Sequence, residues 1–333
     1  MTYDLRLKTK IITLFFLLWA SVAVAADDYR LVSLQVMKPA KQPVSFTGRS
    51  PAIYAVLYAT GTRGETHTFR NDSLHAVAAA IGVKETLEEI ESLADYDVPV
   101  YNFYSFCTDT VSCADSVEAI TENDLLIIVK NVTVTPFQRV EKRVSELSYD
   151  NYFNVGSYAV YTASFEVYDT ITRTFSHRET LSDTLVWDKN ALNATEALSE
   201  LPSTAEAAQL AAAEAGKLYA RRLAPYWLTV QRFFYVPSYK NMEQAAAHAE
   251  NAEWSEAMKI WEQYAGHNNR KTAAQAAFNM ALACEVNGDY ELSLEWLQYA
   301  EKSYPISAIA GYRAVLQRRL NESAILEKQL QDL

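Results

Sequence analysis

Residues 274–305 constrain the possible fold more than any other segment of this chain. The segment divides into two helix-length halves, separated by the turn sequence Gly-Asp-Tyr at 288–290. Ala281 and Ser293 are small residues on the two predicted helices, and they allow the helix axes to approach each other closely. A helical hairpin of this kind exposes an apolar face that it cannot bury alone, so it must stack against neighbouring elements.

The residue order of this segment is typical of a tetratricopeptide repeat (TPR), a helical unit of about 34 residues. A poorer unit precedes it, in which Trp254 takes the place of Tyr290, and one further helix is predicted over 306–320. Two repeats and a closing helix are fewer than the roughly three repeats that a free solenoid needs. The missing burial must therefore come from elsewhere in the chain.

The segment YWLTVQRFFY at 226–235 directly precedes these repeats. Large aromatic side chains mostly serve burial, so we expect an aromatic linker that joins the repeats to the rest of the chain. An exposed docking strip is the alternative. We expect no β-strand beyond Pro225.

The N-terminal half alternates between strand and helix patterns. Strands are predicted at 30–37, 52–59, 124–134 and 158–168, with a partner strand running towards 186–187. A helix begins near 74, and Gly82 is expected to close it. Ser203 and Glu206 form a capping box for a long helix that Pro225 ends.

This order predicts an α+β chain, with an N-terminal α/β sheet domain followed by an all-α TPR-like helical domain. The length of 333 residues fits about two domains. We place a signal peptide at 1–25, the α/β domain at 26–225, and the aromatic linker with the TPR-like helical repeats at 226–333.

The first 25 residues have the pattern of a secretory signal peptide. Three basic residues precede an apolar run at 11–19, and Ala23-Val24-Ala25 has the form of a cleavage site. A membrane anchor is the alternative, but the apolar run is shorter than the roughly 20 residues of a spanning helix. No cysteine stands at the cleavage point to take a lipid. We therefore expect an exported, periplasmic or envelope-associated protein with no transmembrane segment.

Charge and cysteine content narrow the range of partners. A net charge of −11 disfavours nucleic acid as a partner, because both molecules are acidic. Cys107 and Cys113 could form a disulfide in an oxidising compartment, and two free thiols are the alternative. Cys284 is predicted to be a small core residue.

Two resemblances to known families follow from these patterns. Asp124 before its apolar strand, and Val167-Tyr168-Asp169 at the end of another, resemble the α/β fold of curli-secretion and TolB-N-like lipoproteins. The segments 220–235, 251–265 and 271–302 are similar to domain-of-unknown-function family 6340, a family of Bacteroidota envelope proteins with a terminal TPR-like pair. The second resemblance implies an envelope protein without an assigned activity, so it transfers no catalytic residue.

The sequence contains little that supports catalysis. Its five histidines lack metal-ligand spacing, and no nucleophile elbow, phosphate loop or dinucleotide fingerprint occurs. We therefore expect no catalytic residue, cofactor or metal. The alternative hypothesis is an envelope enzyme with an unrecognised site in the α/β domain, around His177, Glu179 and Asp169.

We expect a non-catalytic envelope protein that binds or scaffolds a partner protein or peptide. First helices line the groove in TPR architectures, so the predicted groove residues are Arg270, Gln275, Asn279 and Glu285. A structural subunit of a larger assembly is a further alternative. The sequence leaves the oligomeric state open.

Overall fold

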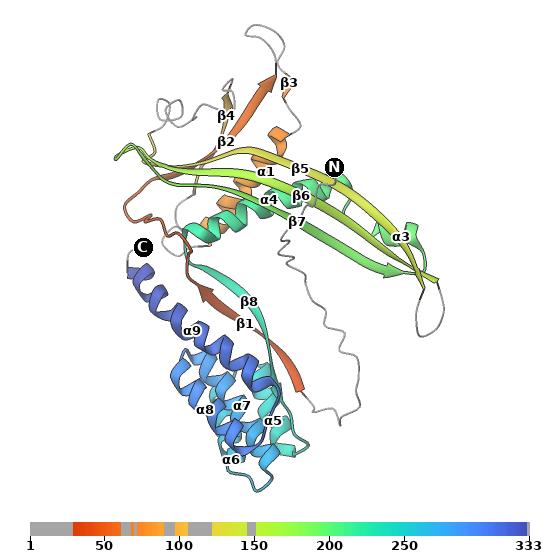
Figure 1. Ribbon diagram of the computed structural model, residues 1–333. Helices are drawn as coiled ribbons and strands as arrows, with labels where there is room; N and C mark the ends of the chain where they lie inside the picture. Colours follow the sequence, from red (N-terminus) through yellow and green to blue (C-terminus); the bar gives the residue numbers. More distant parts are fainter. Residues whose placement is uncertain are drawn as a thin grey trace, which may run out of the picture. The chain divides into compact units, whose positions relative to one another are not determined.

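The computed structural model describes residues 29–60, 68–69, 72–89, 97–105, 122–144 and 151–331. The predicted signal peptide at 1–25 and the predicted Cys107–Cys113 pair lie outside these residues. The described chain forms two compact units, a sheet unit of Ala40–Tyr226 and a helical unit of 29–39 with Trp227–Gln331 (Figure 1). Among the helices described, none combines the length and the apolar character needed to cross a membrane.

The sheet unit is built on a mixed six-stranded sheet in the order β3-β2-β5-β6-β7, with β4 also paired to β2. Its strands are β2 (Pro51–Thr60), β3 (Thr68–Phe69), β4 (Val100–Ser105), β5 (Leu125–Val144), β6 (Asn151–Asp169) and β7 (Thr174–Ala191). Strand β2 runs parallel to β4 and β5, whereas β5, β6 and β7 are antiparallel neighbours. The predicted hairpin that turns after Asp169 is confirmed.

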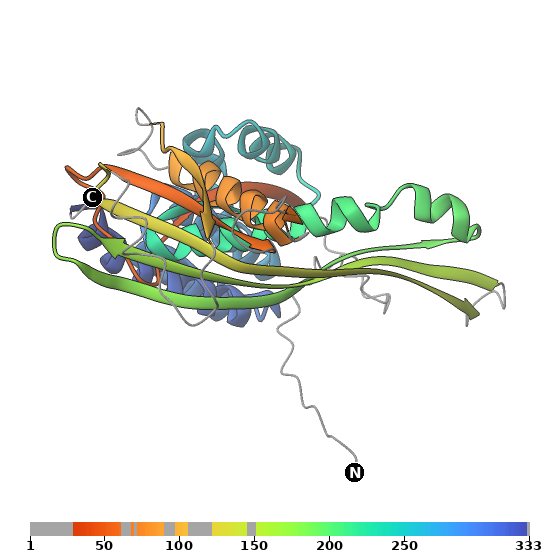
Figure 2. The ribbon, with the colours of Figure 1, turned by 90° about the horizontal axis from the view of Figure 1, so that it is seen from above.

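Strands β5, β6 and β7 are much longer than the rest of the sheet. They contain 20, 19 and 18 residues, yet β5 pairs with β2 only over Leu125–Val129. The three strands therefore continue as a separate ribbon, which Figure 2 shows extending beyond the other strands. A bulge with Asn131 at φ 51° marks the start of this extension on β5.

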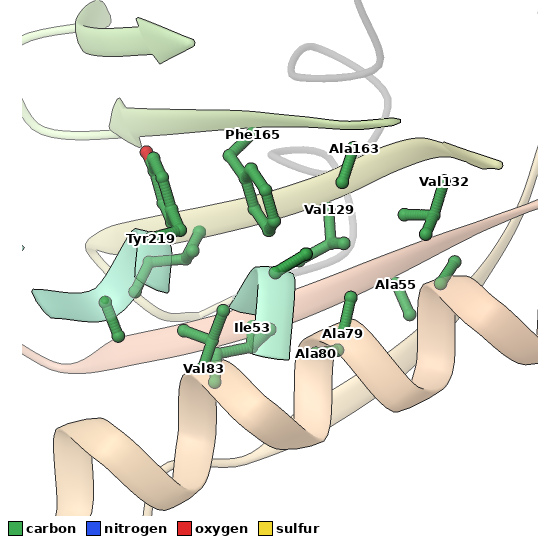
Figure 3. Close-up of a cluster of buried hydrophobic side chains, with 14 of the residues drawn as sticks. Ile53, Ala55, Ala79, Ala80, Val83, Val129, Val132, Ala163, Phe165 and Tyr219 are labelled. Carbon is green, nitrogen blue, oxygen red and sulfur yellow. The ribbon is translucent and has the colours of Figure 1, made fainter. Parts of the chain in front are cut away.

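Helices α1 (Asp72–Glu88) and α4 (Thr204–Leu223) cover one face of this sheet, and the short α3 (Ala194–Ser199) lies on the same side. The capping box of Ser203 and Glu206 starts α4 as predicted. Alternate residues of β6 point into the core, where Phe165 stacks on Tyr219 of α4 at 4.3 Å between ring centroids (Figure 3). Burial of this apolar face supplies the main driving force for folding of the unit.

Two glycines allow α1 and α4 to cross at very short range. A Cβ atom at Gly82 would lie 2.0 Å from the carbonyl oxygen of Ala213, and one at Gly216 would lie 1.9 Å from that of Ala79. The prediction that Gly82 closes the helix is wrong, because α1 continues to Glu88. Gly82 serves close helix packing instead, and that role depends on a helix much later in the chain.

The helical unit contains five helices, in which each packs on the next along the chain. They are α5 (Lys240–Glu250), α6 (Trp254–Ala265), α7 (Arg270–Asn287), α8 (Tyr290–Ser303) and α9 (Ala308–Gln331). Gly288 ends α7 in the left-handed conformation that favours glycine, with φ 84°. Ser293 donates a hydrogen bond of 2.5 Å to the carbonyl oxygen of Ala281, so α7 and α8 approach closely at the predicted small residues.

The helical unit also contains two strands, which differs from the predicted organisation. β1 (Tyr29–Lys38) and β8 (Tyr226–Tyr235) form a two-stranded sheet. The sequence predicts 226–235 as a linker without a strand and places 29–38 in the α/β domain, and both predictions are wrong. Both strands instead bury apolar side chains in the same core as the helices, among them Leu34, Val36 and Phe234. Because β1 and β8 lie so far apart in the sequence, no local sequence pattern reveals that they pair.

The glycine crossing gives a matched test of stability. Gly82→Ala should lower the free energy of unfolding of the sheet unit by about 1–3 kcal/mol or more, because the added methyl group overpacks the helix contact. Gly311→Ala, in α9 with open space around its Cα, should instead be neutral or stabilise by up to about 1 kcal/mol. Urea unfolding followed by circular dichroism measures both variants. Equal effects of the two substitutions would contradict the close crossing.

Candidate functional site

The four predicted groove residues all lie on α7, but they do not line an open groove. Gln275, Asn279 and Glu285 are buried. Arg270 lies at the start of α7 and donates hydrogen bonds to the carbonyl oxygens of Ser303 and Lys302, at 2.8 and 3.2 Å. The structure therefore uses Arg270, Asn279 and Glu285 for contacts within the chain.

Asn279 holds the end of strand β8. Its Oδ1 accepts a hydrogen bond from the backbone N–H of Tyr235 at 2.8 Å, and its Nδ2 donates to the carbonyl oxygen of Tyr235 at 2.7 Å. The side chain is fully buried. The Asn279 amide thus takes the place of a neighbouring strand for Tyr235. It satisfies the N–H and C=O groups of Tyr235, which would otherwise be costly to bury.

Glu285 anchors the same strand through a buried ion pair. Arg232 of β8 donates two hydrogen bonds to its carboxylate, from Nε at 2.9 Å and from a terminal nitrogen at 2.8 Å. Tyr312 of α9 donates a third from its hydroxyl group at 2.7 Å. Burial and the neighbouring Glu285 charge raise the pKa of Tyr312 well above its ordinary value, so the phenol keeps its proton and remains a donor.

Aromatic packing fills the space between these polar contacts. The ring of Phe278 on α7 contacts the rings of Phe233, Tyr235 and Tyr312, with centroid separations of 5.3, 5.2 and 5.1 Å. This face of α7 is therefore occupied by the protein's own strand β8. Surfaces elsewhere on the helical unit are the ones available to a partner.

Helix α8 carries one such surface, which the sequence analysis missed. Leu292 and Tyr299 are 42% and 44% exposed, and Trp296 lies between them at helical spacing. The rings of Trp296 and Tyr299 meet edge to face at 5.9 Å, and the Tyr299 hydroxyl donates to the carbonyl oxygen of Ala265 at 3.0 Å. We call Leu292, Trp296 and Tyr299 the α8 stripe. The sequence shows the helical spacing of these three residues. In the structure each of them precedes a buried residue of the same helix, namely Ser293, Leu297 and Ala300.

The sheet unit contains a pocket of about 380 Å³. Its lining residues are Gln42, Pro43, Val44, Ser45, Arg49, Leu125, Asp169, Ser176 and His177. Two of the three residues of the alternative enzyme hypothesis, Asp169 and His177, therefore share a pocket, whereas Glu179 does not line it. Backbone hydrogen bonds of 2.8 Å from Gln42 and Val44 to the end of α4 fix one wall.

Asp169 is held in its ionised form by the surrounding structure. It pairs with Arg49 at 2.5 Å and accepts hydrogen bonds from the backbone N–H groups of Ile171 and Thr172. Burial opposes ionisation, but the hydrogen bonds and the Arg49 charge outweigh it and lower the pKa of Asp169. Arg49 also lies 3.5 Å from Asp124, so the two aspartates that begin β5 and end β6 share one guanidinium group.

The surroundings of His177 disfavour the protonated ring. Its Nδ1 lies 2.9 Å from the hydroxyl oxygen of Tyr219, and its Nε2 lies 3.7 Å from Glu179, which pairs with Arg222. Burial, and secondarily the charge of Arg222, lower the pKa of His177. Burial also raises the pKa of Tyr219. Asp169 and Nδ1 of His177 are thus engaged in structural contacts, whereas Nε2 of His177 has no hydrogen-bond partner in the described part of the chain. Among the described side chains that line the pocket, none is paired as a nucleophile with its base.

Metal binding gains no support from the described side chains. Within the described ranges, no group of three or more His, Cys, Asp or Glu side chains could hold a metal ion. Cys284 is buried, as predicted, and burial raises the pKa of its thiol to about 11. It therefore packs as a small core residue.

Comparison with known proteins places parts of the chain in families without an assigned function. Residues 243–321, which span most of the five helices, match the family model described as "Domain of unknown function (DUF6340)", the family that the sequence was predicted to resemble. Residues 115–235, from before β5 to the end of β8, match "Domain of unknown function (DUF8603)". No curated protein matches the chain.

One solved structure with some similarity is a PelC dodecamer from Paraburkholderia phytofirmans. The sequences are 13% identical, and the alignment covers 58% of this chain and 99% of that chain, with a TM-score of 0.23.

The ion pair of Arg232 and Glu285 gives a test of how β8 is held. Glu285→Gln should destabilise the helical unit by about 3–5 kcal/mol, because it leaves the buried Arg232 charge unpaired. Replacing the whole group by apolar residues, as Arg232→Met, Glu285→Leu and Tyr312→Phe together, should recover much of that loss. Lys259→Met, which removes an exposed pair with Glu256, should change stability by less than about 1 kcal/mol. Urea unfolding measures all three, and an E285Q effect as small as that of K259M would contradict the anchoring role.

The pH dependence of the sheet unit tests the environment of His177. The pKa of this ring is lower in the folded protein than the ordinary 6.5, so the unfolded chain binds its proton more readily. The free energy of unfolding should therefore fall as the pH drops below 6.5, by at most about 1.4 kcal/mol per pH unit for this group. His177→Gln should reduce the fall. Parallel pH profiles for wild type and H177Q between pH 7.5 and 5 would contradict this assignment.

Proposed function

We propose that this protein is a non-catalytic component of the cell envelope that binds a partner protein through TPR-like helices. The α8 stripe is the observation that carries this proposal. Leu292 and Tyr299 are exposed, and Trp296 is partly exposed while it also packs against the helical core. Apolar and aromatic side chains left exposed in a row on a helix are typical of protein interaction sites. The helical hairpins support the TPR-like assignment through their order, the small residues where they meet and the glycine turn between α7 and α8.

The expected location and partner class follow from the sequence. The basic and apolar leader supports export to the periplasm or envelope, and the net charge of −11 favours a protein or peptide over nucleic acid. We also propose that the sheet unit shares the α/β fold of curli-secretion and TolB-N-like lipoproteins. Asp124 and Asp169, the two positions of that resemblance, both approach Arg49.

The α8 stripe differs from the predicted groove in one important respect. The side chains of Asn279 and Glu285 are already used to hold β8, and a partner that needed them would have to break buried hydrogen bonds. The stripe offers its side chains without such a cost. A partner with an apolar or aromatic patch would gain burial of these rings, and the neighbouring acidic residues Glu291 and Glu295 would favour a basic rim on that partner.

An envelope enzyme is the second candidate, and the pocket beside Asp169 and His177 is the observation in its favour. The geometry supports it less well. Asp169 is committed to Arg49 and two backbone groups, and Nδ1 of His177 to Tyr219. Nε2 of His177 has no hydrogen-bond partner among the described residues, but burial disfavours the protonated ring.

Site-specific photocrosslinking in the living source organism tests the proposed function. A photoreactive residue at Leu292 should give a discrete protein adduct, whereas one at the exposed Lys259 of α6 should not. Trp296→Ala should greatly weaken the Leu292 adduct while leaving the circular dichroism spectrum unchanged. If Leu292 gives no adduct beyond that at Lys259, partner binding at the α8 stripe is ruled out.

A further inference from the structure

The ribbon formed by the long strands has an apolar patch on the face turned away from helices α1, α3 and α4. Phe137, Tyr158 and Val186 lie in one row across β5, β6 and β7, and Val160 follows on β6. Phe137, Val160 and Val186 are each 42–44% exposed. We call these four residues the ribbon patch. It is independent of the α8 stripe, because it lies in the sheet unit.

The ribbon patch is flat and ordered. The rings of Phe137 and Tyr158 are nearly parallel, at 6°, with centroids 5.0 Å apart. The Tyr158 ring lies over Gly156, where a Cβ atom would come within 2.5 Å of the ring. Gly156 therefore allows the aromatic ring to lie down along the strand. A flat surface of this kind suits packing against another sheet, which takes place at about 10 Å between sheets.

The charged residues beside the ribbon patch are arranged so that one copy of the chain can complement a second copy. The next row along the ribbon is Arg139 on β5, Gly156 on β6 and Asp188 on β7. Arg139 and Asp188 are exposed and lie on opposite outer strands of the ribbon, and within its own strand Arg139 also pairs with the partly exposed Glu141. A two-fold rotation about an axis along β6 exchanges the positions of β5 and β7, so each arginine would face an aspartate of the other copy.

The same rotation matches the apolar residues. Phe137 would face Val186 of the partner subunit, and Tyr158 and Val160 would meet their own counterparts on the axis. A two-fold axis perpendicular to the strands through the Phe137 row would instead place Arg139 over Thr135 of the partner subunit. The axis along β6 brings both the apolar pair and the charge pair into register at once.

The local charge also favours a second copy over other occupants. The face carries Arg139 and Arg143 against Glu141 and Asp188, so it is neutral in a chain whose net charge is −11. Copies of an acidic chain repel each other through most of their surface, and a neutral apolar face is where they can meet. Next to the patch, Thr162 bonds Ser182, and Ser164 bonds Thr180, each at 2.9 Å, so the bordering hydroxyl groups are already satisfied.

We propose that the ribbon patch is a homodimer interface, in which the β5–β7 ribbons of two copies pack face to face about a two-fold axis along β6. Arg139 of each copy pairs with Asp188 of the partner subunit at the edges of the interface. Sheets that pack in this aligned way cross at about 30°. The apolar row supplies the affinity, and the charge pairs fix the orientation.

Sedimentation equilibrium with charge reversal tests this proposal. The wild-type chain should show a monomer–dimer equilibrium. Arg139→Asp and Asp188→Arg should each weaken the dimer at least about tenfold, because each places like charges opposite one another. The double variant R139D/D188R should restore it. Lys142→Asp, on the opposite face of β5, is the matched control and should leave the dimer unchanged.

A second variant keeps the test independent of the charge pairs. Val160→Lys, on the axis, should give a folded monomer at every concentration, with folding checked by circular dichroism. A wild-type chain that is monomeric at all concentrations would overturn the proposal, as would a double variant no more dimeric than the single variants. Failure of photocrosslinking at Leu292 would leave this result unaffected, so the two proposals fail separately.

Discussion

Two buried polar side chains on α7 set the constraint on which the helical unit depends. Asn279 and Glu285 lie in a largely apolar core, where an unpaired amide or carboxylate would cost several kcal/mol. Strand β8 satisfies both, through the backbone of Tyr235 and the guanidinium group of Arg232. The strand is therefore part of the core. It also supplies burial that two helical hairpins and a closing helix lack.

This arrangement changes which surfaces can serve function. Because β8 occupies one face of α7, a partner of the helical unit must use another surface, and the α8 stripe is one such surface. The sheet unit has a corresponding feature in the ribbon, where β5, β6 and β7 extend beyond the other strands of the sheet and leave one face without a covering helix among those described. In both units, the side chains at the predicted sites contribute to stability, and the exposed apolar rows are available for contacts with other molecules.

Local sequence patterns predicted the elements that depend on neighbours in the chain. The β6–β7 hairpin, the Ser203 capping box and the Gly288 turn each depend on residues that lie close together in the sequence. The misassigned features depend on distant partners: Gly82 on Gly216 of α4, and β8 on β1 and α7. The sequence predicted Asn279 and Glu285 as groove residues of a first helix. Their role could not be assigned from that helix alone, because it is set by a strand outside the repeat pattern.

The integration of β8 into the helical core can be measured most directly by native-state hydrogen exchange. The backbone N–H of Tyr235 donates to Asn279, so it should exchange only when the helical unit unfolds, with the same opening free energy as the slowest amides of α7. Its exchange should also respond to denaturant as steeply as theirs. Fast exchange of Tyr235 while α7 remains protected would show that β8 separates easily from the helices, and it would contradict the central claim that the strand is part of the core.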